Sequence, residues 1–211
     1  MRLVPDSQSH RAIGFRDARH SGGLGFQASV AFISVPDLDA ALGGAVTAGG
    51  SVERSPWSVP MAGRMARFAD ASGTVYGLLE SATPGVVAVV PAPFGHNPRP
   101  PAGSICSVEM FAADGEIAAA FFRKQFGWGA APTMPQYVMF DPGAGIGGVF
   151  QSHTPGTRGI AYIYSTNVRA TIVAIEAAGG HAMGEPMTAP GMATFGYFTD
   201  PSGTPMGLIG P

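Results

Sequence analysis

Residues 198–210 read Phe-Thr-Asp-Pro-Ser-Gly-Thr-Pro-Met-Gly-Leu-Ile-Gly, and residues 68–80 read Phe-Ala-Asp-Ala-Ser-Gly-Thr-Val-Tyr-Gly-Leu-Leu-Glu. In both stretches the sequence Asp-x-Ser-Gly-Thr, whose residues favour a tight turn, separates two runs that contain apolar residues. Each stretch therefore predicts a strand, a turn and a second strand. Gly73 and Gly203 lie 130 positions apart, so an offset of 130 relates the two stretches.

This offset holds backwards, without a gap, through a whole module. It aligns Pro60 with Pro190, and it aligns the triplet Ala-Gly-Gly at 48–50 with the same triplet at 178–180. A gapless repeat of about fifty residues indicates one supersecondary unit that the chain uses at least twice.

The first complete module runs from about Ser29 to Glu80. An apolar strand at 30–35 is followed by a helix, which Asp37 or Asp39 can cap and which Gly49-Gly50 ends. Three further strands are predicted at Ser51–Glu53, Gly63–Asp70 and Val75–Leu79. The predicted order is one strand, one helix and three strands, or βαβββ.

The remaining chain follows the same pattern. Residues 104–151 predict a module whose helix begins after Asp114 and ends at Gly127, and residues 160–209 are the copy of the first complete module. Residues 1–27 look like the end of a module whose first half is absent. Residues 81–103 contain six prolines, a density that prevents a helix or a central strand. We therefore predict an N-terminal domain of residues 1–80, a linker of residues 81–103 and a C-terminal domain of residues 104–211.

The composition excludes several classes of protein. Charged residues make up 12% of the chain and hydrophobic residues 45%, so the chain can build a core. A net charge of −2 without a basic stripe argues against nucleic acid as a partner. No apolar run is long enough to span a membrane and the first residues do not form a signal peptide, so we expect a cytoplasmic protein. The single Cys106 excludes an internal disulfide.

Two further motifs identify a family. The sequence Phe-Phe-x-x-x-Phe-Gly-Trp occupies 121–128 in one module, and the next module carries Ala-Gly-Gly followed by Asp-x-Ser-Gly-Thr. With these motifs the chain resembles the vicinal oxygen chelate superfamily, which includes glyoxalase I, bleomycin resistance proteins and extradiol dioxygenases. The resemblance covers roughly residues 20–80 and 104–210. It implies an α+β fold of tandem βαβββ modules that form two cupped half-barrels, the first incomplete at its N-terminus.

The resemblance also locates the metal ligands of the family. In its metal-using members, each module offers a His or Glu near the start of the first strand and a Glu in the last strand. The matching positions in this chain are Val30, Ser107 and Ile160 in the first strands, and Gly77, Gly207 and about Gly148 in the last strands. None of these side chains can hold a divalent ion, so we expect neither a metal nor another cofactor.

Glu109, Tyr162 and Tyr164 are the polar candidates for acid–base or ligand-binding groups. Residues two apart on a strand share a face, so Glu109 lies on the face of Ser107 and Phe111, which the resemblance directs into the second cup. The two tyrosines share the face of Ile160 for the same reason. Phe150 and Tyr137 complete the predicted lining of the site. The alternative for Glu109 is a solvated position at the rim or a hydrogen bond to a backbone amide, and the alternative for the tyrosines is plain packing.

Three functions are compatible with these residues. The first is a metal-free protein, similar to glyoxalases and bleomycin resistance proteins, that binds a small apolar or aromatic molecule in a cup. The second is a lyase, isomerase or dioxygenase-type enzyme that uses Glu109 and a tyrosine as acid and base. The third is a subunit that is active only in a larger assembly. An incomplete first module would leave a sheet edge uncovered, which predicts a homodimer.

Overall fold

The computed structural model describes residues 13–16, 30–83, 99–143, 145–153, 159–189 and 193–211. Contacts divide the chain into two compact units. The first unit comprises residues 1–90 and 110–159, and the second comprises residues 91–109 and 160–211. Most of the proline-rich segment 81–103 lies outside the described residues, so the predicted linker and the domain division at this segment stay predictions.

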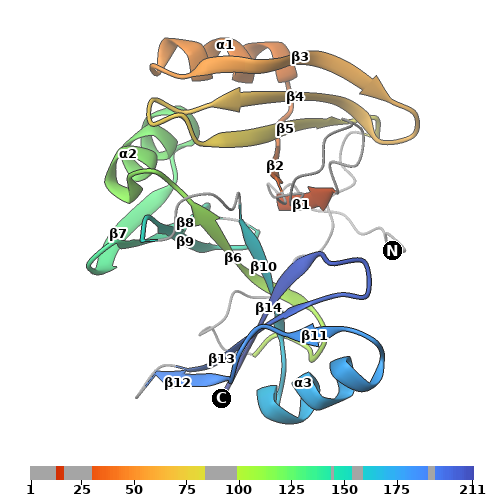
Figure 1. Ribbon diagram of the computed structural model, residues 1–211. Coiled ribbons are helices and arrows are strands. Elements are labelled where there is room, and N and C mark those ends of the chain that lie inside the picture. The colour runs from red at the N-terminus through yellow and green to blue at the C-terminus, as the bar shows by residue number, and fades with distance from the viewer. Residues whose placement is uncertain (1–12, 17–29, 84–98, 144, 154–158, 190–192) are drawn as a thin grey trace. The chain divides into compact units, whose positions relative to one another are not determined.

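The first unit contains the first complete module, and its five elements follow the predicted βαβββ order (Figure 1). They are β2 (Val30–Ser34), α1 (Leu38–Thr47), β3 (Ser51–Val59), β4 (Gly63–Ala69) and β5 (Val75–Ser81). Together with β1 (Ile13–Arg16) the strands form a sheet in the order β1-β2-β5-β4-β3. β3 is longer than predicted, because it lies at the sheet edge, where Pro56 interrupts no central ladder.

The helix α1 begins and ends where its sequence requires. The side chain of Asp37 accepts a hydrogen bond from Ala40 N at 2.9 Å, so Asp37 is the cap and Asp39 lies in the first turn. Leu38 and Leu42 are buried toward the sheet. The chain leaves the helix through Gly49, whose φ of 101° favours glycine.

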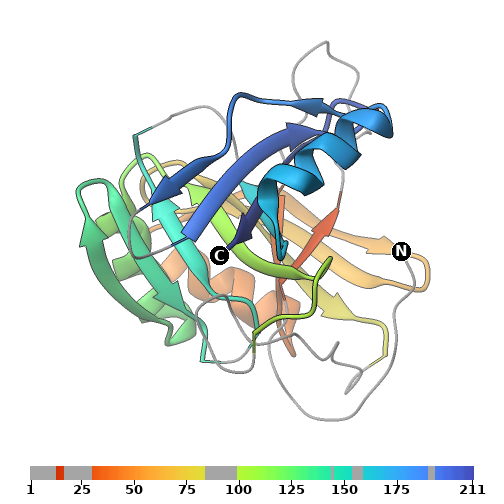
Figure 2. The ribbon, with the colours of Figure 1, turned by 90° about the horizontal axis from the view of Figure 1, so that it is seen from below.

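The second unit contains the copy of this module. Its elements are β10 (Ile160–Tyr164), α3 (Val168–Ala177), β11 (His181–Ala182), β12 (Met187–Ala189), β13 (Ala193–Thr199) and β14 (Pro205–Gly210). β10 pairs in parallel with β14, and Tyr162 lies opposite Gly207, just as Phe32 lies opposite Gly77 in the first copy. The register thus confirms the repeat. α3 covers one sheet face, where Val168 and Ile172 pack on β13 and β14 (Figure 2).

The third module contributes β6 (Ile105–Phe111), α2 (Gly115–Phe126), β7 (Gly129–Met134), β8 (Tyr137–Asp141) and β9 (Gly148–Gln151). α2 ends at Gly127 with a φ of 71°, as predicted. The ring of Phe122 stacks on Trp128 with centroids 4.6 Å apart, and that of Phe121 stacks on Phe68 at 5.5 Å. This aromatic core holds α2 between its own strands and β4. The sequence did not predict β7.

The Asp-x-Ser-Gly-Thr motif forms the same turn in both copies. Asp70 Oδ1 accepts hydrogen bonds from the backbone of Ser72 and Thr74, at 2.9 and 3.0 Å. In the second copy Asp200 accepts from Ser202 N and Thr204 N, both at 2.8 Å. The side chain then mimics a turn of backbone, which explains why the motif recurs.

The open sheet edge that was expected near the N-terminus is not found on β2. β1 pairs antiparallel with β2, so Gly14 lies opposite Phe32, in the same way as Ser107 lies opposite Tyr162. Ile13–Arg16 supply the strand that pairs with β2, and this strand is the terminal one of the described sheet, so the uncovered sheet edge stays a prediction. The homodimer, which was argued from that edge, stays an untested prediction.

Candidate functional site

Three polar side chains meet on one face of the sheet in the second unit. They are Glu109 on β6, Tyr162 on β10 and Tyr197 on β13. Tyr162 and Tyr197 both lie opposite Gly207 in β14, so the glycine separates the two tyrosines in one cross-strand row. On the other side of Tyr162, β6 places Ser107 directly opposite and Glu109 two residues further along. The face is the one that α3 does not cover.

Gly207 makes this arrangement possible. A Cβ atom at this position would lie 2.5 Å from Cδ1 and Cε1 of Tyr162, so the ring lies directly over the glycine backbone. Gly77 and Phe32 repeat this contact in the first copy, where the corresponding distance is 2.3 Å. A glycine beside a ring on the neighbouring strand is therefore a common property of the two modules.

The hydroxyl of Tyr162 joins the other two groups. It hydrogen-bonds Glu109 Oε2, and it lies 2.7 Å from Tyr197 Oη. A phenol carries one proton, so it cannot donate to both partners. With Glu109 ionised, Tyr197 donates to Tyr162, and Tyr162 donates to the carboxylate. With Glu109 protonated, both hydrogen bonds run in the opposite direction.

Burial determines which of these three hydrogen-bonded side chains keep their protons. Glu109 and Tyr162 are each 5% exposed, whereas Tyr197 is half-buried. Burial first, and then the charge of Glu109, raise the pKa of Tyr162 far above the ordinary value of a phenol. Tyr162 therefore keeps its proton and can relay one, but it does not serve as a phenolate base.

Apolar side chains surround the polar chain. Tyr164 and Phe195 both lie opposite Ile209, one row from Tyr162. The ring of Phe195 meets that of Tyr162 edge-on with centroids 6.3 Å apart. Met187, opposite Phe195 on β12, is 62% exposed. The accessible end of this face therefore combines the Tyr197 hydroxyl with the Phe195 ring and a flexible thioether.

The structure unites some of the predicted site residues and separates others. Glu109 and Tyr162 are hydrogen-bonded to each other. Ser107 lies in the cross-strand row of Tyr162, and Tyr164 lies in the next row. Phe150 is fully buried in the aromatic core of the first unit, with its ring 4.7 Å from that of Phe140, and does not line this face. Phe111 is half-buried in the first unit.

Tyr137 also lies in the first unit, where its hydroxyl is 3.2 Å from His153 Nε2. Tyr197 was not predicted. Its strand, Ala-Thr-Phe-Gly-Tyr-Phe-Thr at 193–199, is clear in the sequence, but only the cross-strand register places its hydroxyl next to that of Tyr162.

Cys106 is fully buried on the opposite face of β6, and burial raises the pKa of its thiol to about 12. It therefore cannot act as a nucleophile near neutral pH.

The side chains present do not fit a divalent metal of the kind that the superfamily uses. The last-strand position of the second copy is Gly207, and the ring of Tyr162 fills the space in which a carboxylate side chain would begin. Of the first-strand positions, Val30 and Ile160 offer no donor atom, and Ser107 offers a neutral hydroxyl rather than an imidazole, carboxylate or thiolate. Within the described part of the chain, no three His, Cys, Asp or Glu side chains come together.

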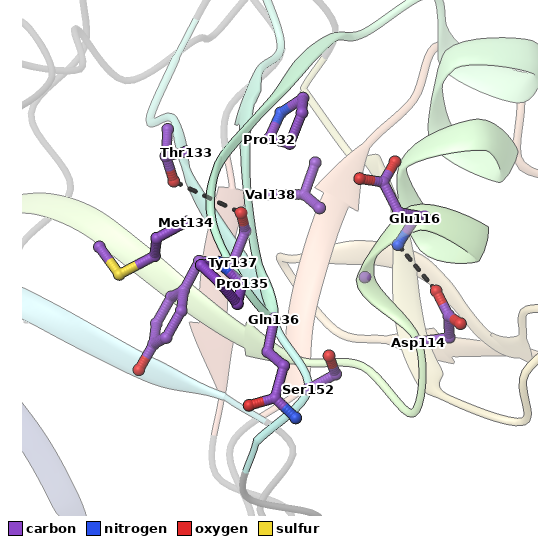
Figure 3. A pocket seen from close by; sticks show the side chains of 11 residues that line it. Asp114, Glu116, Pro132, Thr133, Met134, Pro135, Gln136, Tyr137, Val138 and Ser152 are labelled. Carbon is purple, nitrogen blue, oxygen red and sulfur yellow. Dashed lines mark hydrogen bonds between the residues drawn. The ribbon is translucent and has the colours of Figure 1, made fainter.

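A pocket of about 520 Å³ lies elsewhere, in the first unit, between the start of α2 and the β7–β8 hairpin (Figure 3). Tyr137 is the only residue of the predicted set that lines it. The polar chain on the second unit and this pocket are therefore two separate candidate sites.

Comparisons with known proteins agree with the fold. Residues 105–143 match the family described as bleomycin resistance protein-like N-terminal. CFP32 of Mycobacterium tuberculosis, for which its name proposes glyoxylase activity, is 25% identical over 187 residues, which cover 85% of this chain and 68% of CFP32. The corresponding protein of Mycobacterium bovis gives the same values.

Solved structures extend the comparison. The 2,3-dioxygenase LapB from Pseudomonas sp. KL28 superposes with a TM-score of 0.61 at 14% identity, covering 89% of this chain and 73% of LapB. The Mn(II)-bound glyoxalase from Novosphingobium aromaticivorans gives 0.60 at 15% identity, covering 87% and 63%. The resemblance found in the sequence is thus confirmed: the chain has the α+β fold of the vicinal oxygen chelate superfamily. No helix in the described residues is long and apolar enough to cross a membrane.

Proposed function

We propose that this protein binds a small apolar or aromatic molecule on the sheet face of the second unit, and that it does so without a divalent metal. The observation that carries the proposal is the ring of Tyr162 over Gly207, which occupies the position of a family metal ligand and brings two phenols and a buried carboxylate into one chain. Buried polar groups within an apolar surface are typical of sites that orient a small ligand.

The polar chain also indicates which group of the ligand it selects. Tyr197 is its half-buried member, and with Glu109 ionised the proton of Tyr197 is directed toward Tyr162. The oxygen of Tyr197 then accepts a hydrogen bond. The ligand therefore presents an O–H or N–H donor to Tyr197 and places its apolar body against Phe195 and Met187.

Titration calorimetry with phenol and its methyl ether, anisole, tests this proposal. We expect phenol to bind more tightly by about 1 kcal/mol, the typical contribution of one hydrogen bond. The replacement Tyr197→Phe should abolish this difference, whereas Tyr76→Phe, the same change in the first unit, should preserve it. Adding EDTA should leave both affinities unchanged. Equal affinities for the two probes, or binding that EDTA removes, would refute the proposal.

The relay itself favours an acid–base enzyme as a second candidate. A proton from a bound molecule can pass to Tyr197 while Tyr197 passes its own to Tyr162 and Tyr162 passes its own to Glu109. An enzyme of this kind would exchange a carbon-bound hydrogen of its ligand for deuterium in heavy water, and Glu109→Gln would stop the exchange. A pure binding protein would show no deuterium exchange, either unchanged or as the Glu109→Gln variant. The cytoplasmic location and the homodimer stay proposals beside these functions.

A further inference from the structure

The pocket of the first unit has a floor and walls from three segments. Gly115 at the start of α2 and Val138 on β8 meet at the floor, where a Cβ atom on Gly115 would lie 3.3 Å from Val138 Cγ2. The β7–β8 hairpin, residues 132–138, forms one wall, and Asp114 and Glu116 form the other (Figure 3). A volume of about 520 Å³ is within the range that holds small organic molecules.

The hairpin wall is held in place by its own hydrogen bonds. Gln136 has a φ of 66°, an unusual value for a residue other than glycine, and its carbonyl oxygen accepts a hydrogen bond from Ser152 N at 3.0 Å. Thr133 Oγ1 donates to Tyr137 O at 3.4 Å. The Ser152 bond ties the tip of the hairpin to the residue after β9, and the Thr133 bond closes the hairpin itself, so the pocket exists before any ligand enters.

The start of α2 presents negative charge and few free donors. Asp114 Oδ1 accepts hydrogen bonds from Glu116 N at 2.9 Å and from Ile117 N at 3.0 Å, so these amides are not available to an anion. The carboxylate of Glu116 is exposed, and no cation pairs with it among the residues that the structure describes. The end of a helix that usually attracts anions is therefore occupied by the protein's own carboxylates.

The opposite wall carries no charged side chain and includes several apolar ones. Figure 3 shows the side chains of Glu116 and Val138 directed toward the same space, with Pro132 beside them. Met134 and Pro135 line the pocket toward the tip of the hairpin, and Figure 3 shows the ring of Tyr137 directed away from Glu116 and Val138. A ligand that matches both walls has one positive charge and a compact apolar body.

We infer that this pocket is a binding site for a small organic cation, such as an alkylated or aromatic ammonium compound. The cation lies against the carboxylate of Glu116, and its apolar body lies on Pro132 and Val138. This site is separate from the polar chain of Glu109, Tyr162 and Tyr197, and it involves none of those side chains.

Benzyltrimethylammonium, with benzyl alcohol and benzoate as neutral and anionic comparisons, tests this inference by nuclear magnetic resonance. We expect saturable shifts of the backbone amides of 114–117 and of the non-proline residues within 132–138 with the cation, weaker shifts with the alcohol and none with benzoate. Because an exposed ion pair contributes little, Glu116→Gln should weaken binding about two- to fivefold, and added salt should have a similar effect. Glu176→Gln, which makes the same change at an exposed position of α3, is the matched control.

Four outcomes would overturn the inference. They are the absence of a saturable shift at this pocket, equal or tighter binding of benzoate there, equal weakening by both Gln variants, and shifts confined to 193–199. The last outcome would locate the cation at the polar chain instead. Circular dichroism of each variant confirms that it is folded, which is expected because both glutamates are exposed.

Discussion

The replacement Gly207→Ala tests the geometry of the polar chain directly. The new methyl group would lie 2.5 Å from two ring carbons of Tyr162, about 1 Å closer than ordinary van der Waals contact. The ring must then move, and its hydroxyl leaves Glu109 and Tyr197. Overpacking costs about 1–3 kcal/mol, and the loss of the hydrogen bond from Tyr162 to a buried carboxylate costs about 1–3 kcal/mol more. Alanine favours a strand over glycine by about 0.5–1 kcal/mol, so we expect a net loss of about 1–5 kcal/mol.

Urea unfolding followed by circular dichroism measures this loss. Tryptophan fluorescence is a poor probe for it, because Trp57 and Trp128 both lie in the first unit. The control is the same replacement in a Tyr162→Ala chain, where the missing ring leaves room for the methyl group. There we expect Gly207→Ala to cost nothing. A neutral Gly207→Ala in the otherwise unchanged protein, or an equal loss in both backgrounds, would refute the reasoning.

Three other predictions concern the repeat and the buried groups. Gly77→Ala should destabilise the first unit in the same way, by about 1–3 kcal/mol, and Phe32→Ala should remove this effect in unfolding experiments. Asp200 has a pKa below its ordinary value, mainly through hydrogen bonds from Ser202. Its contribution to stability is therefore present above the ordinary carboxyl pKa and is lost as the pH falls through the lowered pKa. Acid titration of the Asp200→Asn variant should show a smaller loss of folding stability than that of the unchanged protein. Cys106 should react with a thiol reagent at pH 8 only as fast as the chain unfolds, since burial raises its pKa to about 12; fast labelling of the folded protein would contradict this.

The parts of the fold that were predicted correctly depend on local chemistry. The turn at Asp70 and its copy at Asp200 form because each carboxylate accepts hydrogen bonds from residues two and four positions later. The α2 helix begins after Asp114 and ends at Gly127 for equally local reasons. These features could be predicted because neighbouring residues alone determine them.

The polar chain was only half predictable, because it depends on register between strands. Strand alternation correctly placed Glu109 and Tyr162 on facing positions of the second unit, but it gave no reason to add Tyr197, which lies on a strand that is not adjacent to β10. Phe150 was assigned to the wrong side for a related reason. β9 pairs Phe150 with Val138, so both side chains point toward α2 and into the aromatic core.

The two copies of the module share a backbone but differ in the chemistry that it carries. At the position of Tyr162 the first copy has Phe32, which packs on a glycine in the same way but has no hydroxyl to donate or accept a hydrogen bond. At the position of Tyr197 it has Arg67, whose Nε lies 2.7 Å from Glu53 Oε2 in an ion pair of its own. In both copies the ring lies too close to the backbone beneath it for a Cβ atom, so this packing requires glycine. The chain of two phenols and a carboxylate is not required for folding, because the first copy folds without one, and this is the strongest reason to look for the ligand on the second unit.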